Sequence, residues 1–231
     1  MRTETTGEPR GCAIVPAYRE VGRIGAVVRA IREMIDDVIV VDDGSPDDTG
    51  REAESAGAVV IRHAVNLGKG AALQTAFRAA VRQGFDYAIT LDGDGQHAPA
   101  DIPRFIQAYR ETGVPVLVGN RMHDARSMPL VRWLTNRFMS WLLSREMGQR
   151  VPDTQCGYRL YRLAAVSGVV LQSARFAAES EILMDLSRQG VRIGAVPVAT
   201  IYGTEQSKIN PLKDTVRFFK MLHRHRKARK S

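Results

Sequence analysis

Two aspartates one residue apart, Asp92 and Asp94, follow an apolar run that begins at Tyr87, and Gln96 comes two residues later. Successive side chains of a strand point to opposite faces, so residues i and i+2 share a face. We therefore expect both carboxylates to converge at the tip of a buried strand. Carboxylate and amide oxygens suit a hard cation such as Mg²⁺ or Mn²⁺, bound together with a phosphorylated substrate. The competing interpretation is a glycine-rich turn with solvated aspartates, because Asp and Gly are common turn residues.

A glycine-rich segment around Lys69 is a second candidate for phosphate binding. Gly68-Lys69-Gly70 lacks the Ser or Thr that follows the lysine of a P-loop, so it is not a Walker motif. At the start of a helix it could still hold an anion on backbone N–H groups, and a flexible turn with a solvated lysine is the alternative. His63, His97 and His123 have no partner four residues away, which favours surface or supporting roles over a transition-metal site.

The composition indicates one folded α/β domain with an appendage. The chain has 231 residues, of which 44% are hydrophobic, and a formal net charge of +8. Such a basic chain indicates an anionic partner, which could be a nucleotide, a phospholipid surface or a nucleic acid. Only Cys12 and Cys156 are present, which fits a reducing compartment. The sequence shows no signal peptide and no apolar stretch of about 20 residues, so we expect a cytoplasmic protein without a transmembrane helix.

The first half of the chain alternates strand-like and helix-like segments. Apolar runs predict strands at 12–15, 38–41, 58–61, 87–92 and 116–118, and helical spacing predicts helices at 24–35, 70–83 and after Pro99. Ser45 is expected to be the N-cap of a further helix, with Pro46 in its first turn. This order predicts a doubly wound, mostly parallel α/β sheet with helices on both faces. Ligands of such sheets bind at the carboxyl ends of the strands, where residues 16–20, 42–43 and 92–94 lie.

After Arg121 the pattern changes. We predict an amphipathic helix at 128–147, a strand at 157–161, a helix at 177–189 and a strand at 191–198, where Pro197 favours the sheet edge. Residues 203–208 are loop-like. The predicted organisation is a disordered stretch at 1–10, a main domain at 11–210 with halves 11–121 and 122–210, and a basic amphipathic C-terminal helix or tail at 211–231.

Seven motifs in order along the chain resemble those of the family-2 inverting glycosyltransferases. They are Pro16-Ala-Tyr-Arg-Glu20, Val41-Asp-Asp-Gly-Ser45, Asn66-Leu-Gly-Lys-Gly70, Leu91-Asp-Gly-Asp-Gly-Gln-His97, Gly119-Asn-Arg121, Asp153-Thr-Gln-Cys-Gly-Tyr-Arg159 and Ser207-Lys208. Within that family the chain looks most like the dolichol-phosphate or polyprenol-phosphate mannosyltransferase branch. The resemblance implies a nucleotide-sugar binding fold of the GT-A type and a divalent metal on the Asp-x-Asp motif. It also implies sugar transfer from a nucleotide donor to a lipid phosphate.

Carried over by position, the resemblance implies site residues along most of the chain. The nucleotide sugar would be held by Pro16, Ala17, Tyr18, Glu20, Asp42, Asp43, Lys69, Asp92, Gly93, Asp94, Arg121 and Lys208. The metal ligands would be Asp92, Asp94 and Gln96, and the catalytic residues would be Asp94, Arg121 and Asp153. The chain departs from the family in two ways: residues 200–206 contain no arginine before Ser207-Lys208, and the C-terminal transmembrane helices of some relatives are absent.

The helix at 128–147 is the expected site of the acceptor phosphate. Arg132 and Asn136 lie four residues apart and therefore share one face, and Arg121 is expected to contact the same phosphate. An amphipathic surface of the kind that settles at a membrane interface is supplied by Trp133, Phe138 and Trp141. The plain alternative is a core helix with a solvated arginine.

These observations predict a metal-dependent inverting glycosyltransferase that moves a hexose to polyprenyl phosphate at the cytosolic membrane face. Mannose from GDP-mannose is the favoured donor, and the alternative is a UDP-hexose with another lipid, a saccharide or a soluble acceptor. The enzyme would be peripheral on anionic membranes, because residues 217–230 combine apolar and basic side chains. A nucleic-acid binding protein is a remote alternative, and no nucleic-acid partner is expected, because the basic tail is not interleaved with aromatic residues.

Three carboxylates keep two interpretations each. Glu179 and Glu181 are either catalytic or acids that the dipole of a helix start favours, with the structural role preferred. Asp153 is either a general base or a residue that orients Arg159 or an acceptor. An acceptor phosphate is already an anion at pH 7 and does not require a base.

Overall fold

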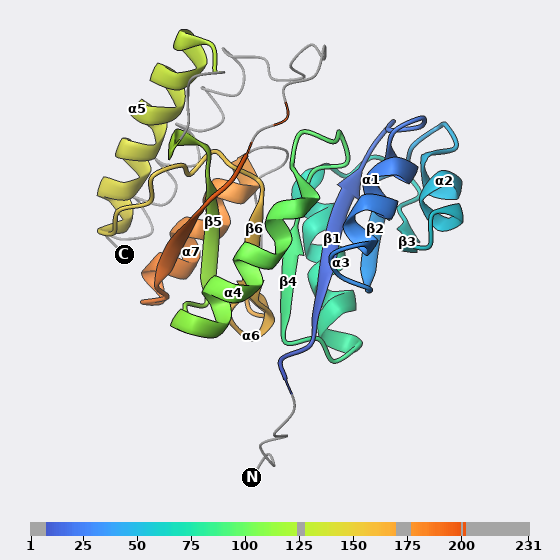
Figure 1. Cartoon of the computed structure of the whole chain (residues 1–231), viewed down its shortest axis with the longest axis horizontal. Helices are drawn as coiled ribbons and strands as arrows, with labels where there is room; N and C mark the ends of the chain where they lie inside the picture. The colour runs from blue at the N-terminus through green and yellow to red at the C-terminus, as the bar shows by residue number, and fades with distance from the viewer. Residues whose placement is uncertain (1–7, 124–127, 170–176, 200, 202–231) are drawn as a thin grey trace.

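The computed structural model describes residues 8–123, 128–169, 177–199 and 201. Within these residues one seven-stranded sheet has the order β3-β2-β1-β4-β6-β5-β7 (Figure 1). The strands are β1 (Gly11–Ala17), β2 (Val38–Asp42), β3 (Val59–Arg62), β4 (Tyr87–Thr90), β5 (Val116–Asn120), β6 (Arg159–Arg162) and β7 (Ile193–Pro197). Only β6 runs antiparallel to its neighbours, so the prediction of a mostly parallel sheet is confirmed. β7 lies at the sheet edge, as Pro197 predicts.

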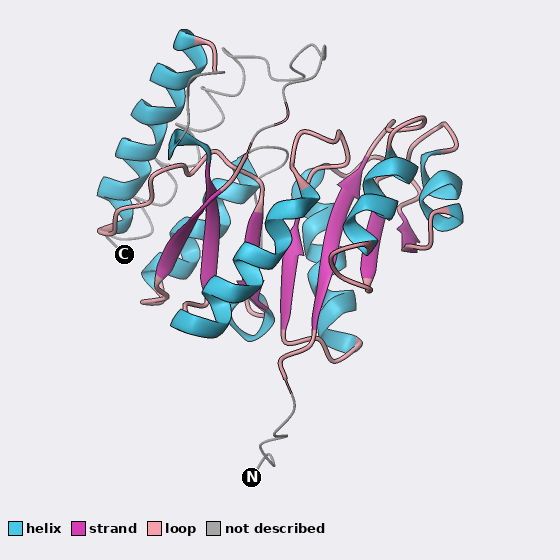
Figure 2. Cartoon of the chain, viewed as in Figure 1, coloured by secondary structure: helices cyan, strands magenta, loops and turns pink. Residues whose placement is uncertain are grey.

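Helices cover both faces of this sheet, which is the doubly wound arrangement predicted from the sequence (Figure 2). They are α1 (Ile24–Arg32), α2 (Thr49–Ser55), α3 (Lys69–Arg82), α4 (Ile102–Thr112), α5 (Leu130–Met147), α6 (Leu163–Val166) and α7 (Ala177–Arg188), with short 3₁₀ helices at Pro99–Asp101 and Arg121–His123. α1 and α4 lie on one face, whereas α3, α6 and α7 lie on the other. α5 packs against α7 at the side of the molecule.

The core explains why the central strands are apolar along their whole length. All five residues of β2, which lies between β3 and β1, are buried, because helices cover both faces of a parallel sheet. Cys12 and Cys156 are free and fully buried within this core. Burial raises the pKa of the Cys12 thiol to about 12 and that of the Cys156 thiol to about 11, so both thiols stay protonated at neutral pH.

One local prediction is wrong. The helix expected to begin at Ser45 begins at Thr49 instead, because residues 45–48 form a bend and turn. The N-cap is Asp48, whose side chain makes no capping hydrogen bond, and the carboxylate of Asp47 accepts a hydrogen bond from the Thr49 N–H at 3.1 Å within the preceding turn.

The C-terminal predictions, namely the loop at 203–208, Lys208 and the helix or tail at 211–231, lie outside the described residues. No helix in the described segments is both long and apolar enough to span a bilayer.

Candidate active site

The three predicted clusters meet at one edge of the sheet. β1 lies between β2 and β4, and all three strands are parallel, so their carboxyl ends are neighbours. Ala17 pairs with Asp42, and the Asp43 N–H donates to the Ala17 carbonyl at 2.9 Å. β5 has the same direction as β4, and it delivers Arg121 to this edge as well. The expected convergence of residues 16–20, 42–43 and 92–94 is therefore confirmed.

Asp43 organises the loop that leads into α3. Its carboxylate accepts hydrogen bonds from the N–H groups of Leu67 at 2.9 Å and Gly68 at 2.7 Å. His63 Nδ1 lies 2.7 Å from the same carboxylate, and its Nε2 lies 3.0 Å from the Thr75 hydroxyl. His63 is thus mostly buried and has a supporting role rather than a surface one. The backbone amides before α3 already hold an anion, which is the chain's own carboxylate.

Residues 16–20, at the end of β1, form a second part of the predicted nucleotide site. Glu20 is 6% exposed, its N–H donates to the Thr49 hydroxyl at 2.9 Å, and Arg23 contacts its carboxylate at 3.1 Å. Arg19 has a left-handed φ of 56°, which is uncommon for a residue with a side chain. Tyr18 is 36% exposed and open to a ligand. Pro16 and Ala17 end the strand beneath these residues.

Two further predicted residues, Asp42 and Gly93, lie beside the end of β1. The Asp42 carboxylate accepts a hydrogen bond from the Ser45 N–H at 3.0 Å, so it shapes the turn after β2. Gly93 faces β1, because a Cβ at that position would lie 3.4 Å from Glu20 Cγ and 3.5 Å from Ala17 Cβ. The turn that carries the aspartates therefore packs directly on the end of β1 and the start of α1.

The Asp92 and Asp94 pair lies in a turn, so the argument from strand alternation is wrong. β4 ends at Thr90, and residues 93–95 form a turn in which Gly95 has a φ of +78°. The Gln96 N–H donates to the Asp94 carboxylate at 3.0 Å and closes this turn. Asp92, Asp94 and Gln96 are all partly exposed. A turn, rather than a pleated strand, therefore carries all three residues.

A partly buried lysine neutralises Asp92. Lys69 Nζ lies 2.5 Å from Asp92 Oδ1 and 3.1 Å from Glu179 Oε1. Burial alone would raise the pKa of Asp92, but the ammonium of Lys69 and the His97 ring outweigh that effect and hold it far below its usual range. Burial would also lower the pKa of Lys69, whereas Asp92 and Glu179 raise it above its usual value. Both groups are therefore charged at neutral pH.

Glu179 and His97 complete this cluster. The carboxylate of Glu179 meets Lys69 from the first turn of α7, so the structure gives Glu179 a place in the site that its position at a helix start did not reveal. His97 is 7% exposed, and its Nε2 lies 3.4 Å from Asp92 Oδ2 without forming a hydrogen bond. His97 is therefore a buried neighbour of the metal candidate. Glu181 is also buried.

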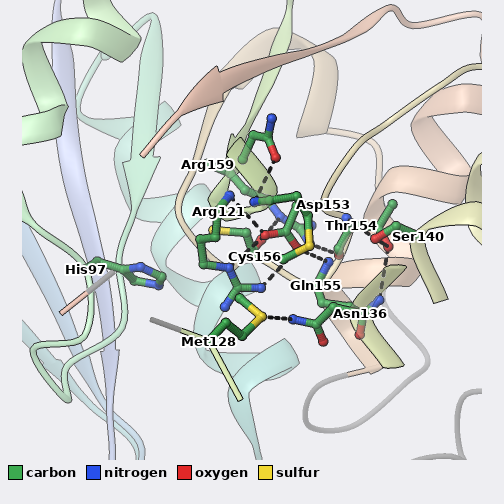
Figure 3. Close-up of polar contacts among 12 residues, drawn as sticks. His97, Arg121, Met128, Asn136, Ser140, Asp153, Thr154, Gln155, Cys156 and Arg159 are labelled. Carbon is green, nitrogen blue, oxygen red and sulfur yellow. Dashed lines mark hydrogen bonds and ion pairs between the residues drawn. The ribbon is translucent and has the colours of Figure 1, made fainter. Parts of the chain in front are cut away.

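Arg121 and Asp153 form a buried bidentate ion pair at the same edge (Figure 3). Arg121 Nε donates to Asp153 Oδ2 at 2.7 Å and Nη2 donates to Oδ1 at 3.0 Å, while the backbone N–H of Arg121 donates to Oδ2 at 3.2 Å. Asp153 is 1% exposed. Its carboxylate thus positions Arg121, and the idea that it orients Arg159 is wrong.

Arg159 has a structural role of its own. Its guanidinium is fully buried and donates to the carbonyls of Thr154, Cys156 and Glu179 and to the Tyr161 hydroxyl. These bonds fix the segment that enters β6 against the start of α7. This structural role could not be predicted from the sequence, because an arginine in a motif gives no sign of whether it contacts protein or ligand.

The polar stripe of α5, with Arg132, Asn136 and Ser140, and its apolar stripe have different surroundings. Ser140 is buried, and its hydroxyl accepts a hydrogen bond from the Thr154 N–H at 2.9 Å, next to Asp153 (Figure 3). Arg132 and Asn136 lie on the same stripe and are partly exposed. The apolar stripe is at least half exposed at Leu130, Val131, Leu134, Phe138 and Trp141. The core-helix alternative is therefore wrong for this stripe.

The residues around Asp92 fit a divalent cation only if the substrate completes its coordination. No group of three or more His, Cys, Asp or Glu side chains in the described segments could hold a metal ion. Two carboxylates and an amide are too few for an all-protein cage, but Mg²⁺ is commonly bound by one or two carboxylates together with substrate phosphates. The unsatisfied Nε2 of His97 beside Asp92 shows that this pocket lacks a polar partner.

Comparison with known proteins decides the family. The family described as "Glycosyl transferase family 2" matches residues 12–169. The chain belongs to this glycosyltransferase family. Several relatives match this chain over most of their own length. Their names confirm the predicted resemblance to the polyprenyl-phosphate branch.

Two glycosyltransferase relatives illustrate this branch. An undecaprenyl-phosphate mannosyltransferase of Micrococcus luteus is 32% identical over 207 residues, covering 83% of this chain and 84% of the relative. A UDP-N-acetylglucosamine–dolichyl-phosphate N-acetylglucosaminyltransferase of Methanococcus voltae is 34% identical over 217 residues, covering 84% and 86%. The two names share a lipid-phosphate acceptor and differ in the sugar.

The fold of this glycosyltransferase is shared with solved structures of another enzyme. Glucosyl-3-phosphoglycerate synthase from Mycobacterium tuberculosis, solved with uridine diphosphate, has a TM-score of 0.72 at 22% identity and covers 94% of this chain and 80% of that one. A second structure of that enzyme contains Mn²⁺ and uridine diphosphate, with a TM-score of 0.70. The predicted GT-A fold is confirmed.

Proposed function

We propose that this glycosyltransferase moves a hexose, with mannose from GDP-mannose favoured, from a nucleotide donor to polyprenyl phosphate with inversion. The observation that carries the proposal is the meeting of the nucleotide-side clusters, the Asp92–Asp94 turn and Arg121 at one sheet edge. A diphosphate at that edge would find both carboxylates for a cation and basic side chains for its remaining charge. Relatives named as lipid-phosphate mannosyltransferases support the acceptor and the sugar.

The chain's own residues account for the remaining chemistry. Asp92, Asp94 and Gln96 would hold Mg²⁺ or Mn²⁺, which supplies positive charge beside the departing diphosphate. An oxygen of the acceptor phosphate attacks the anomeric carbon while the bond from that carbon to the nucleotide oxygen breaks on the opposite side. Arg121 faces the developing charge in an orientation that Asp153 fixes. The prediction that Asp153 acts as a general base has a competing role in the structure, because both oxygens of its carboxylate accept hydrogen bonds from Arg121.

A UDP-hexose donor is the second candidate, because the Methanococcus voltae relative is named for UDP-N-acetylglucosamine. The two donors can be separated with radiolabelled GDP-mannose, UDP-glucose and UDP-N-acetylglucosamine, each supplied with polyprenyl phosphate and Mn²⁺, followed by lipid extraction. We expect label in the lipid fraction from GDP-mannose and loss of that label in EDTA. Label from a UDP-sugar alone would select a UDP-sugar donor, and label in no lipid product would contradict transfer to polyprenyl phosphate from either donor.

We further propose that α5 receives the lipid phosphate at a membrane surface. Its apolar stripe is exposed, as an interfacial helix requires. Its polar stripe is anchored through Ser140 to the segment that carries Asp153. The two stripes would place the lipid tail outside and its phosphate near Arg132 and Arg121.

Replacing Arg132 with alanine tests this placement. We expect the apparent Michaelis constant for polyprenyl phosphate to rise about tenfold, because a charge-assisted contact with phosphate would be lost, while the affinity for the nucleotide sugar stays nearly unchanged. Steady-state kinetics with each substrate varied in turn would measure both constants. Arg145→Ala, which removes an exposed arginine from the last turn of the same helix, is the matched control. Equal losses for both substrates would place Arg132 in the scaffold instead.

A further inference from the structure

The cluster around Asp92 contains more charge than a simple metal site needs. Lys69 Nζ contacts Asp92 Oδ1 at 2.5 Å, so the ammonium already occupies the coordination space of one carboxylate oxygen. A divalent cation bound to that oxygen and an ammonium at this distance would repel each other strongly at low local dielectric. Cation binding therefore requires the ammonium of Lys69 to move.

The structure provides a second carboxylate to which the ammonium can move. Glu179 Oε1 lies 3.1 Å from Lys69 Nζ, and its side chain is 8% exposed. Arg159 Nη1 donates to the Glu179 carbonyl at 2.6 Å and fixes the backbone at the start of α7. Lys69, by contrast, is the first residue of α3 and has a long flexible stem. Arg159 thus fixes the backbone that carries the Glu179 carboxylate, and the lysine with its flexible stem is the more movable partner.

Gly157 shows how closely these three groups approach. A Cβ at position 157 would lie 2.8 Å from Glu179 Oε1, 3.2 Å from Lys69 Nζ and 3.3 Å from Asp92 Oδ2. Any side chain would therefore push the three charged groups apart. The absence of a side chain at 157 keeps both carboxylates within reach of one ammonium. Glu179 and Gly157 belong to the second half of the chain. They therefore bring that half into contact with the turn that carries Asp92 in the first half.

We propose that Lys69 is an internal counter-ion of Asp92 that gives way to a divalent cation, and that Glu179 is the positioning residue that holds the displaced ammonium. This inference rests on the proposed metal-dependent function. In the cation-free protein, Lys69 keeps Asp92 ionised and compensated. When the cation and the nucleotide diphosphate bind, the ammonium keeps Glu179 as its partner and lies beside the diphosphate. Glu179 thereby lowers the free-energy cost of clearing Asp92.

The test is a titration with Mn²⁺, followed by the electron paramagnetic resonance signal of the free ion, first without nucleotide and then with GDP or UDP. We expect Glu179→Gln to weaken Mn²⁺ binding at least about fivefold, the lower end of typical coupling between two sites. The near-isosteric amide keeps the shape of the side chain but cannot compensate the displaced ammonium. Glu54→Gln is the matched control. Glu54 lies on α2 and forms an exposed ion pair with Arg62 at the end of β3, so this variant removes the same charge away from the cluster.

Lys69→Met is expected to change the Mn²⁺ affinity in the opposite direction. Without the competing ammonium, Mn²⁺ should bind in the presence of GDP or UDP at least about fivefold more tightly than it binds to the wild type, by the same measure of coupling. In the Lys69→Met background the effect of Glu179→Gln should shrink, because Glu179 acts through Lys69. Circular dichroism and thermal unfolding would check that each variant is folded, and Glu179→Gln against Glu54→Gln decides the matter if Lys69→Met does not fold.

Three results would overturn the inference in distinguishable ways. Unchanged Mn²⁺ affinity in Glu179→Gln would show that Glu179 has no part in cation binding. An equal loss in both backgrounds would show that Glu179 acts only through its charge and not through Lys69. A wild-type protein that binds no Mn²⁺, even with GDP or UDP, would instead contradict the metal-dependent function on which the inference rests.

Discussion

Replacing Asp92 or Asp94 with asparagine is expected to lower sugar transfer by about 10²-fold or more, the scale seen when a main electrostatic group of a site is removed. The amide keeps the shape of each side chain but removes the charge that would hold the cation beside the diphosphate. In Asp92→Asn, Lys69 would also lose its closest partner. Initial rates of lipid glycosylation at saturating Mn²⁺ would measure the effect.

Two controls accompany this prediction. Asp48→Asn removes an exposed carboxylate that pairs with Arg51, and its transfer rate should stay within about twofold of the wild type because exposed pairs contribute little. EDTA should abolish transfer by the wild-type enzyme, and added Mn²⁺ or Mg²⁺ should restore it. Full activity in EDTA, or an Asp94→Asn variant as active as the wild type, would contradict metal-dependent transfer.

Removing the carboxylate of Asp153 is expected to have the largest effect on stability. Asp153→Ala leaves the guanidinium of Arg121 without its bidentate partner at a site where both side chains are at least nine-tenths buried. Breaking a buried pair by deleting one partner costs about 3–5 kcal/mol, because the other charge stays buried. Urea unfolding of Asp153→Ala should therefore show a free energy of unfolding lower by about that amount.

The exposed pair of Asp48 and Arg51 again provides the comparison. Asp48→Ala should change the free energy of unfolding by less than about 1 kcal/mol. Asp153→Asn keeps hydrogen-bonding capacity and should lie between these values, while lowering transfer through the altered orientation of Arg121. A stability loss for Asp153→Ala no larger than that for Asp48→Ala would show that water or another group compensates Arg121.

The sheet and its ligand edge could be predicted because local patterns determine them. Apolar runs such as Val38–Asp42 are buried on both faces and so contain no polar alternation, and the carboxylates that follow them mark the strand ends. The order of strands and helices then places those ends together. This reasoning needs no knowledge of which side chains touch.

Contacts between distant segments could not be predicted in this way. The Lys69–Glu179 contact joins the start of α3 to the start of α7, and nothing near either residue identifies the other. The same holds for Asp153, whose partner is Arg121 rather than the arginine in its own motif. The turn at Asp92 and Asp94 was mistaken for strand because the apolar run continues through Leu91, although strand pairing ends at Thr90.

The position of β6 between β4 and β5 has a consequence for how the protein folds during synthesis. β6 pairs with β4 on one side and β5 on the other, so before residues 159–162 leave the ribosome these two earlier strands have no common neighbour. A nascent chain that ends near residue 121 would expose the unpaired edge of β4, which is a template for association with other chains. We therefore expect that the two predicted halves do not fold independently, and that a fragment of residues 1–121 aggregates where the intact chain does not.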